Sequence, residues 1–594
     1  MKDKLIKRSE VPLQQTWDLT HIFENEEEYE KNVGIFKESA TKFKEKYEHQ
    51  VNQISDVNDL VEAIRDYEDI ITVYSRLIGF AYLDTQTDMA QSKSQSRLGS
   101  ISMLGSQLMS SLTFFESEIK QLSDEFLTEA ANNSGYAIYL EDVIKLKSRQ
   151  LQPESEMILA ALSPVLELPD NGYNITKLSD MKFNSFEVDG VEYPLSFVQF
   201  ENSYQSHPDT KVRRAAFEQF SKDLRSYQNT IANYYSTQVK KEKILADLRG
   251  YDSVFDYLLD EQNVTRDLYD RQIDVLMSEL APHMRNYASK LKKKLGVETL
   301  YYSDLKAPYL QAEAKPISFD KAQELVVEAL SVLGDEYTEV VKHSLYDRWI
   351  DWAGNVGKST GGFCSTIAQS HPYILLSWND SLSEVFTLVH EIGHAVQSVF
   401  TRKRYPGYLQ TKQSRYTIEA PSTLNEMLLS RYLLKDESLT QWVNASMIEN
   451  TYYHNFVTHF LEAAFQREVY KLVEQNVDLQ ADDYNRIFKE QLTKFWGDSV
   501  TLDEGAELTW MRQPHYYMGL YSYTYSAGLT ISTVMSSRIA EKGQSEIDKW
   551  LNALSETETQ KPLDFAKLLD IDLTTDKPLK ETVAFIGSLI DSLE

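Results

Sequence analysis

Two histidines and a glutamate stand close together at His390-Glu391-Ile392-Gly393-His394, with types and spacing that suit hydrolysis at a metal ion. Residues four apart on an α-helix lie on the same face, so His390 and His394 can bind one metal ion together. Glu391 lies one step around the helix, where it can contact a water molecule on the metal rather than the metal itself. Zinc prefers such nitrogen and oxygen ligands, and a catalytic zinc site keeps a fourth position open for water.

The residues around this motif predict the helix that it requires. Ser381 and Glu384 have the spacing of a capping box at a helix N-terminus. We expect the helix to end near Pro406-Gly407, with residues 402–404 supplying positive charge that suits the helix dipole. Gly393 removes a side chain where a neighbouring helix or the metal could approach. The apolar surface of this helix consists of Val385, Phe386, Leu388, Val389, Ile392, Val396 and Val399.

A third metal ligand can be sought by elimination. No Asp, Glu, His or Cys occurs from Ala395 to Ile418, so Glu419 is the first possible ligand after His394. Gln397 and Phe400 stand where a metzincin continuation would need Gly and His, so that pattern fails.

Glu419 has an alternative interpretation, as an acid that stabilises a helix N-terminus next to Pro421. Glu426 lies two helical turns farther along on the same face, from where it could orient a metal-binding histidine.

Beyond these residues, the sequence resembles a known family over most of its length. The motif His390–His394, followed 25 residues later by Glu419-Ala420-Pro421-Ser422, is similar to the zinc peptidases of the thimet oligopeptidase type, family M3. The chain is most similar to the bacterial oligoendopeptidase F branch of that family. The other stretches that carry the resemblance are Thr16–Leu19, Val212–Glu218, Gly361–Cys364, Pro372–Leu376 and the tyrosine-rich segment from His515.

The resemblance implies roles for the motif residues. It implies that His390, His394 and Glu419 bind one zinc ion per chain, and that Glu391 is the general base of peptide hydrolysis. It also implies mostly helical lobes that enclose a deep channel, and short unfolded oligopeptides as substrates.

The tyrosine-rich segment supplies candidates for stabilising the oxyanion of the reaction. The resemblance implies a histidine and one or two tyrosines from this region, and His515 matches directly. The tyrosines can be aligned in more than one register, so we favour Tyr523 and then Tyr525. Each tyrosine can equally belong to an aromatic-rich buried helix.

Two short segments before the motif predict a small β-sheet beside its helix. The apolar run Pro372–Trp378 has the length of a buried strand, and Gly361-Gly362-Phe363 precedes it. An extended peptide could add to the edge of such a sheet through main-chain hydrogen bonds, and the resemblance favours this binding role for Gly361, Gly362 and Phe363. The alternative is that these strands only fill the core.

The remaining chain predicts a mainly α fold with two lobes. At 594 residues it exceeds one ordinary core, and we expect an N-terminal helical lobe over 1–200 and a catalytic domain over 201–594. A hairpin that turns at Asp189-Gly190 would mark the seam between them. The clearest helical segments are 57–84, 205–248, 265–295, 319–333 and 441–476.

Composition narrows the classes of function. A net charge of −29 argues against nucleic acid as a partner. The single cysteine, Cys364, excludes an intrachain disulfide and fits a packed thiol in a reducing compartment. Residues 1–8 lack the apolar run of a secretion signal, and no apolar segment is long enough to span a membrane, so we expect a cytoplasmic enzyme.

Three functions remain open. The first is a zinc endopeptidase. The second is a non-catalytic peptide binder that keeps zinc as a structural element, although such a site has no use for Glu391. The third is an exopeptidase, which would need a residue that captures a substrate terminus, and the sequence identifies none.

Overall fold

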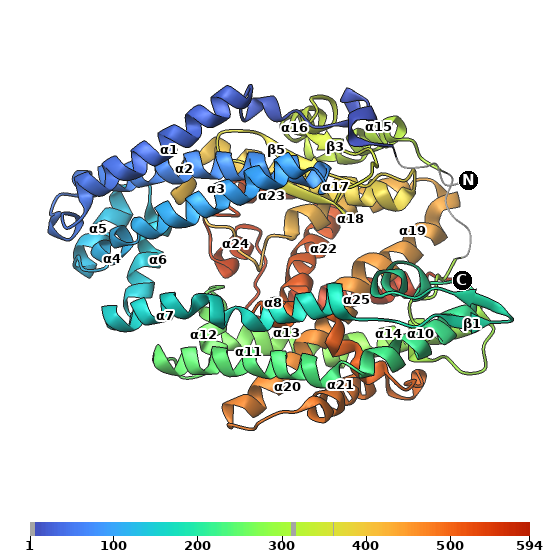
Figure 1. Ribbon diagram of the computed structural model, residues 1–594. Coiled ribbons are helices and arrows are strands. Elements are labelled where there is room, and N and C mark those ends of the chain that lie inside the picture. Colours follow the sequence, from blue (N-terminus) through green and yellow to red (C-terminus); the bar gives the residue numbers. More distant parts are fainter. Residues whose placement is uncertain (1–5, 311–315, 360) are drawn as a thin grey trace.

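The computed structural model describes residues 6–310, 316–359 and 361–594, and it is mainly helical, as the sequence predicts. The sequence predicts that residues 1–8 do not form a secretion signal, and the first five of them lie outside the described part. In Figure 1, α1–α3 lie along one side of the molecule and α11, α20 and α21 along the opposite side, with α17, α18 and α22 between them. No helix among the described residues is both long and apolar enough to cross a membrane.

The N-terminal helices have a hydrophobic core of their own. Its buried side chains run from Trp17 to Val143 and include Ile367, Tyr373 and Leu375 from much later in the chain. The helices that form it are α1 (Glu26–Tyr47), α2 (Val57–Thr87), α3 (Ser92–Ser111), α4 (Phe114–Ile119), α5 (Asp124–Asn133) and α6 (Ala137–Lys147).

A second and larger core begins at Tyr173 and extends to Leu593. Helix α7 (Pro153–Leu166) lies between the two cores in sequence. The helices that follow α7 are α8 (Leu168–Ile175), α9 (Phe197–Gln199), α10 (Thr210–Arg225), α11 (Gln228–Leu248), α12 (Val254–Asp260), α13 (Arg266–Val275), α14 (Ala281–Leu295), α15 (Phe319–Leu330), α16 (Asp335–Tyr346), α17 (Leu382–Arg404), α18 (Ala420–Leu433), α19 (Thr440–Ser446), α20 (His459–Glu474), α21 (Ala481–Trp496), α22 (Thr524–Lys542), α23 (Gln544–Leu554), α24 (Pro562–Leu568) and α25 (Lys577–Asp591). The predicted division into 1–200 and 201–594 stays a prediction.

All five predicted helical segments are helical, but three are interrupted. The segment 205–248 forms two helices, α10 and α11. A π-helical turn, Leu276–Leu280, separates α13 from α14, and a longer π-helical segment, Met447–Thr458, separates α19 from α20. Sequence periodicity predicts the helical face of these segments but does not resolve such local changes in winding.

The predicted hairpin is present. Strands β1 (Phe186–Val188) and β2 (Val191–Tyr193) pair in antiparallel register, and the two residues between them are Asp189 and Gly190. Both have positive φ, 51° and 80°, which a tight two-residue turn of this kind requires. Phe186 packs into the second core, so the hairpin belongs to the larger body of the protein.

A three-stranded sheet lies beside the motif helix, in the strand order β3-β5-β4. Strand β4 (Phe363–Thr366) pairs antiparallel with β5 (Pro372–Leu375), as the sequence predicts, and β3 (Ile350–Asp351) adds a parallel strand that the sequence analysis did not identify. Among the described residues β4 pairs with β5 alone, so it is an edge strand there.

The central strand β5 connects the two cores. Tyr373 and Leu375 point into the N-terminal core, whereas Ile374 and the following Leu376 point into the second core. Successive residues of a strand face opposite sides, so one short apolar run serves both cores. The sheet therefore fixes the N-terminal helices to the body that carries the motif.

Candidate active site

Helix α17 carries the histidine motif near its middle. Its start and end agree with the sequence prediction, because Ser381 occupies the N-cap and Arg402–Arg404 form the last turn. The Oγ of Ser381 accepts a hydrogen bond from the backbone N–H of Glu384 at 3.2 Å. Only this half of the predicted capping box forms, since Asn379 accepts the hydrogen bond of the Ser381 backbone N–H.

Three side chains converge beside this helix. Oε2 of Glu419 lies 3.2 Å from Nε2 of His390 and 3.3 Å from Nε2 of His394. One donor atom from each residue lies within 4.8 Å of the other two. Two imidazole nitrogens and one carboxylate oxygen in this arrangement are a donor set that zinc prefers, so the site fits a catalytic metal.

Glu419 is the residue before α18, at its N-cap, but its side chain does not cap the helix. It turns to the two histidines and accepts a hydrogen bond from Ser422 Oγ at 2.9 Å. Burial alone would raise the pKa of Glu419, but His394 and His390 hold it well below the usual range of a glutamate. The geometry thus favours the ligand interpretation of Glu419 over the helix-terminus interpretation.

Glu426 contacts the other ring nitrogen of His390. Its Oε1 lies 2.7 Å from Nδ1 of His390, and its Oε2 accepts a hydrogen bond from Thr451 Oγ1 at 3.0 Å. A carboxylate in this position keeps the proton on Nδ1, which leaves the Nε2 lone pair free for a metal. This is the contact that the spacing of Glu426 from Glu419 predicts.

Gly393 lets α17 and α18 approach each other closely. A Cβ at this position would stand 2.5 Å from the Cα of Ser422 and 2.7 Å from the carbonyl oxygen of Pro421. Because both are backbone atoms at the start of α18, the absence of a side chain at Gly393 is what allows Glu419 to reach the histidines.

Glu391 faces the pocket that also contains His390 and Glu419. It is only 6% exposed. Burial raises the pKa of Glu391 above its usual range, against the opposing effect of His390 and His394. A carboxylate with a raised pKa is suited to accepting a proton and passing it on.

Gly362 stands next to Glu391. A Cβ on Gly362 would lie 3.5 Å from Glu391 Oε1 and 2.9 Å from Cγ2 of Thr387, so strand β4 passes directly over the motif helix. Gly361 has φ +83°, a conformation that favours glycine. The ring of Phe363 packs near Trp17 and Tyr82 of the N-terminal lobe.

The two candidate tyrosines occupy different environments. Tyr525 lines the pocket of the zinc-ligand candidates, and its hydroxyl lies 3.3 Å from Nε2 of His515. Tyr523 is 1% exposed, and its hydroxyl donates to Oε1 of Gln262 at 2.7 Å, away from that pocket. The geometry therefore favours Tyr525 over Tyr523, whereas the sequence analysis preferred Tyr523.

Three further residues near His515 were not identified from the sequence. Glu462 and His459, on α20, contact each other and His515, and His454 contacts His459. Their spacing of three and five residues along a helix is common, so the sequence carried no signal that would single them out.

Cys364 lies on β4, and burial together with the nearby Glu391 raises the pKa of its thiol well above the usual range. A thiol that stays protonated suits the packing role that the sequence suggests rather than a nucleophile.

Comparison with known proteins agrees with this geometry. Residues 203–585 match the profile of Peptidase family M3, and residues 118–183 match that of Oligopeptidase F. The chain therefore belongs to peptidase family M3, which confirms the predicted metallopeptidase class and the predicted resemblance. Within the family, its relatives are proteins of the oligoendopeptidase F branch.

Among these relatives, Oligopeptidase PepF of Bacillus subtilis is 27% identical over 600 residues, which cover 100% of this chain and 88% of the relative. An oligoendopeptidase F homolog of Borreliella burgdorferi is 26% identical over 99% of both chains. A solved structure of oligoendopeptidase-F from Enterococcus faecium covers 95% of this chain and 97% of its own, with a TM-score of 0.73 and 22% identity. A Chlamydophila abortus protein described as a peptidase has the same fold, with a TM-score of 0.86 at 24% identity over 99% of both chains.

Proposed function

We propose that this protein is a zinc-dependent endopeptidase that hydrolyses internal bonds of short unfolded oligopeptides in the cytoplasm. The observation that carries the proposal is the convergence of His390, His394 and Glu419, two of which, His390 and Glu419, line the same pocket as Glu391. Membership of family M3 and the names of the relatives support the same activity.

His390, His394 and Glu419 would hold one zinc ion per chain, and Glu426 would orient His390. When bound, zinc supplies Lewis acidity, which lowers the pKa of water and polarises the peptide carbonyl. Glu391 would then take the proton of the attacking water and deliver it to the leaving amine. The buried position of Glu391 supports this exchange, because burial brings its pKa closer to neutrality.

Tyr525 and His515 would stabilise the negative charge that develops on the carbonyl oxygen. Burial raises the pKa of Tyr525, so its hydroxyl keeps the proton that it would donate. The 3.3 Å contact between the Tyr525 hydroxyl and His515 Nε2 supports joint action. Tyr523 has the weaker claim, because its hydroxyl already donates to Gln262.

The substrate would bind in extended form along the free edge of β4. Within the described part of the chain the strand pairs only with β5, so its outer edge offers main-chain hydrogen bonds that do not depend on side-chain sequence. Gly361 and Gly362 lead into β4, which begins at Phe363, and Gly362 stands next to Glu391. A peptide bound there would place its backbone beside the base.

The test is cleavage of an internally quenched oligopeptide by wild type and Glu391→Gln, with bound metal measured on both. We expect the variant to keep its zinc and to lose roughly 10²- to 10⁴-fold in kcat. Glu384→Gln, on the first turn of the same helix, is the matched control and should keep its activity. A wild-type protein that holds zinc but cleaves no member of a varied peptide library would contradict the proposal and favour a peptide binder.

A further inference from the structure

A second cluster of titratable side chains lies behind Tyr525. Oε2 of Glu462 accepts hydrogen bonds from Nδ1 of His459 at 2.9 Å, from Nδ1 of His515 at 3.2 Å and from Oγ of Ser522 at 3.0 Å. Glu462 is 1% exposed, so this carboxylate is held inside the protein by its contacts rather than by solvent.

The carboxylate of Glu462 is ionised. Burial alone would raise its pKa, but His459 and His515 lower it far below the usual range of a glutamate. An ionised carboxylate can only accept hydrogen bonds, so both Nδ1 atoms that face it must carry a proton.

This arrangement determines which atom of His515 can face the substrate. With its Nδ1 proton directed at Glu462, the ring presents Nε2 on its other side, where the Tyr525 hydroxyl lies at 3.3 Å. A histidine whose Nδ1 donates to a carboxylate can exchange a proton with a reacting group at Nε2, as in the Ser-His-Asp triad, and so can donate one to a developing oxyanion. Which nitrogen of a histidine carries the proton is set by the partner of the other nitrogen.

We propose that Glu462 is a positioning residue of the active site, which fixes the orientation and tautomer of His515 so that Nε2 works with Tyr525 on the oxyanion. The inference rests on the proposed function for the role of His515, but the contact itself does not. Tyr525 is held from a second side, because its ring stacks on His459 with centroids 4.0 Å apart.

A second metal ion is the alternative occupant of this cluster, since one donor atom each from His459, Glu462 and His515 lies within 4.8 Å of the others. The hydrogen bonds argue against it. Nε2 of His459 faces Nε2 of His454 at 3.0 Å and Nε2 of His515 faces Tyr525, so the ring nitrogens already have partners. At the first site, by contrast, Nε2 of His390 and Nε2 of His394 contact only the carboxylate of Glu419 among the residues described, so both remain available to a metal ion.

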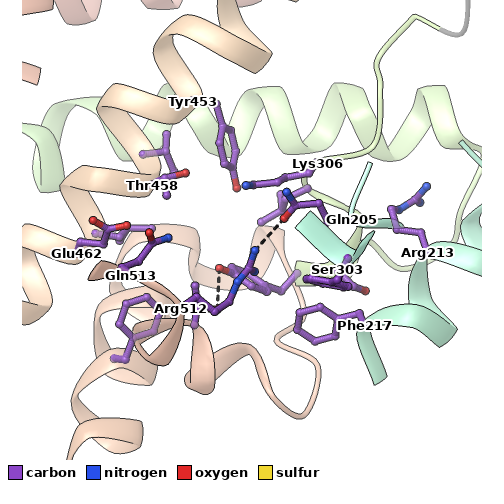
Figure 2. A pocket seen from close by; sticks show the side chains of 17 residues that line it. Gln205, Arg213, Phe217, Ser303, Lys306, Tyr453, Thr458, Glu462, Arg512 and Gln513 are labelled. Atoms are coloured by element: carbon purple, nitrogen blue, oxygen red, sulfur yellow. Dashed lines mark hydrogen bonds between the residues drawn. The ribbon is translucent and has the colours of Figure 1, made fainter. Parts of the chain in front are cut away.

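Other titratable groups lie around the cluster. Glu462 also borders a pocket that contains Lys306 and Arg512, shown in Figure 2, and its Oε1 has no hydrogen-bond partner among the described residues. Burial and the adjacent His459 lower the pKa of His454 to about 3, so His454 is neutral and can accept or donate through its tautomers. Tyr521 faces the His515 ring from the side of Tyr525.

The first experiment reads the tautomer directly. In metal-loaded wild type labelled with ¹⁵N-histidine, we expect His515, assigned by its loss in His515→Phe, to carry a proton on Nδ1. In Glu462→Gln we expect that the His515 proton is no longer confined to Nδ1. Wild-type His515 without a proton on Nδ1 would overturn the proposal, and this measurement needs no peptidase activity.

The second experiment is a double-mutant cycle on peptide cleavage. Glu462→Gln alone should lower kcat by roughly 10- to 100-fold with KM little changed, in the range seen when a supporting carboxylate is removed. In the His515→Phe background the same change should alter kcat less than about twofold, because Glu462 acts through His515. An equal loss in both backgrounds would mean a structural role and would overturn the inference.

Glu242→Gln is the matched control for removing a buried carboxylate. Glu242, on α11, is 5% exposed and bonds to Gln238 and Tyr470, outside the site. It should leave kcat and the His515 signal unchanged. Metal content separates the remaining outcomes: two ions in wild type and one in Glu462→Gln would favour the metal alternative. If wild type cleaves no peptide, the proposed function fails while the His515 tautomer still decides the contact.

Discussion

Gly393 and Ser422 are in backbone contact, with the Cα of Ser422 only 2.5 Å from where a Cβ on Gly393 would stand. The neighbouring atoms are backbone at the start of α18, which cannot rotate away as a side chain could. Any side chain at 393 must therefore displace α18, and with it Glu419.

For this reason Gly393→Ala should lose both metal and activity. Overpacking of this kind costs about 1–3 kcal/mol of stability, and the displaced Glu419 should weaken zinc binding as well. Thermal unfolding, a zinc-chelator competition and peptide cleavage would measure the three effects.

The matched control is Gly34→Ala on α1, where a Cβ would meet nothing within 4 Å. Alanine is the better helix former, so this variant should gain roughly 0.5–1 kcal/mol. If Gly393→Ala bound zinc as tightly as Gly34→Ala, the close contact would not be what sets the position of Glu419.

Glu426→Gln should weaken metal binding without abolishing it. The amide can still contact Nδ1 of His390, but it no longer stabilises the proton there as a carboxylate does. We expect the zinc affinity to fall by roughly 10- to 100-fold, with kcat largely restored at saturating zinc. Competition with a chelator measures the affinity. Thr451→Val, which removes only the donor to the far oxygen of Glu426, should have a smaller effect; an unchanged affinity in Glu426→Gln would contradict the orienting role.

The two tyrosines should separate function from stability. Tyr525→Phe removes a hydroxyl next to His515, and the loss of one oxyanion donor costs about 10²- to 10³-fold in kcat. Tyr523→Phe should keep kcat within about twofold and instead lower stability by about 1 kcal/mol, because Oε1 of the buried Gln262 loses its donor. Parallel kinetics and unfolding curves test the pair. The opposite pattern would return the oxyanion role to Tyr523, the residue that the sequence favours.

Much of the site could be predicted from the sequence because its signals are local. The helix of the motif, its N-cap at Ser381 and the hairpin at Asp189-Gly190 depend on neighbours within a few residues. Glu419 could be found because the 24 residues between His394 and Glu419 include no other possible metal ligand.

What could not be predicted depends on contacts between distant segments. Glu462 on α20 meets His515 on the 3-10 turn Pro514–Tyr517, and nothing in a separation of 53 residues specifies that contact. Tyr523 and Tyr525 differ by two positions, which turns about 200° around a helix, so they face opposite sides. The sequence shows both tyrosines but not which side faces the metal ligands.

The last prediction concerns pH and the buried Glu242. Burial raises its pKa from 4.5 to about 7, although Tyr470 and Gln238 donate hydrogen bonds to it. Between these two values the folded protein holds a proton that the unfolded chain has released. The free energy of unfolding should therefore fall as the pH rises from about 4.5 through about 7, by at most about 3 kcal/mol from this group, and then level off.

Glu242→Gln lacks this proton and should lose that part of the pH dependence. Urea unfolding of both proteins at pH 5 and pH 8 isolates the contribution of the one group, because all other groups are shared. We expect the variant to gain stability relative to wild type at pH 8 compared with pH 5. A difference between the two proteins that stays constant across this range would mean that Glu242 ionises in the folded protein as it does in the unfolded chain.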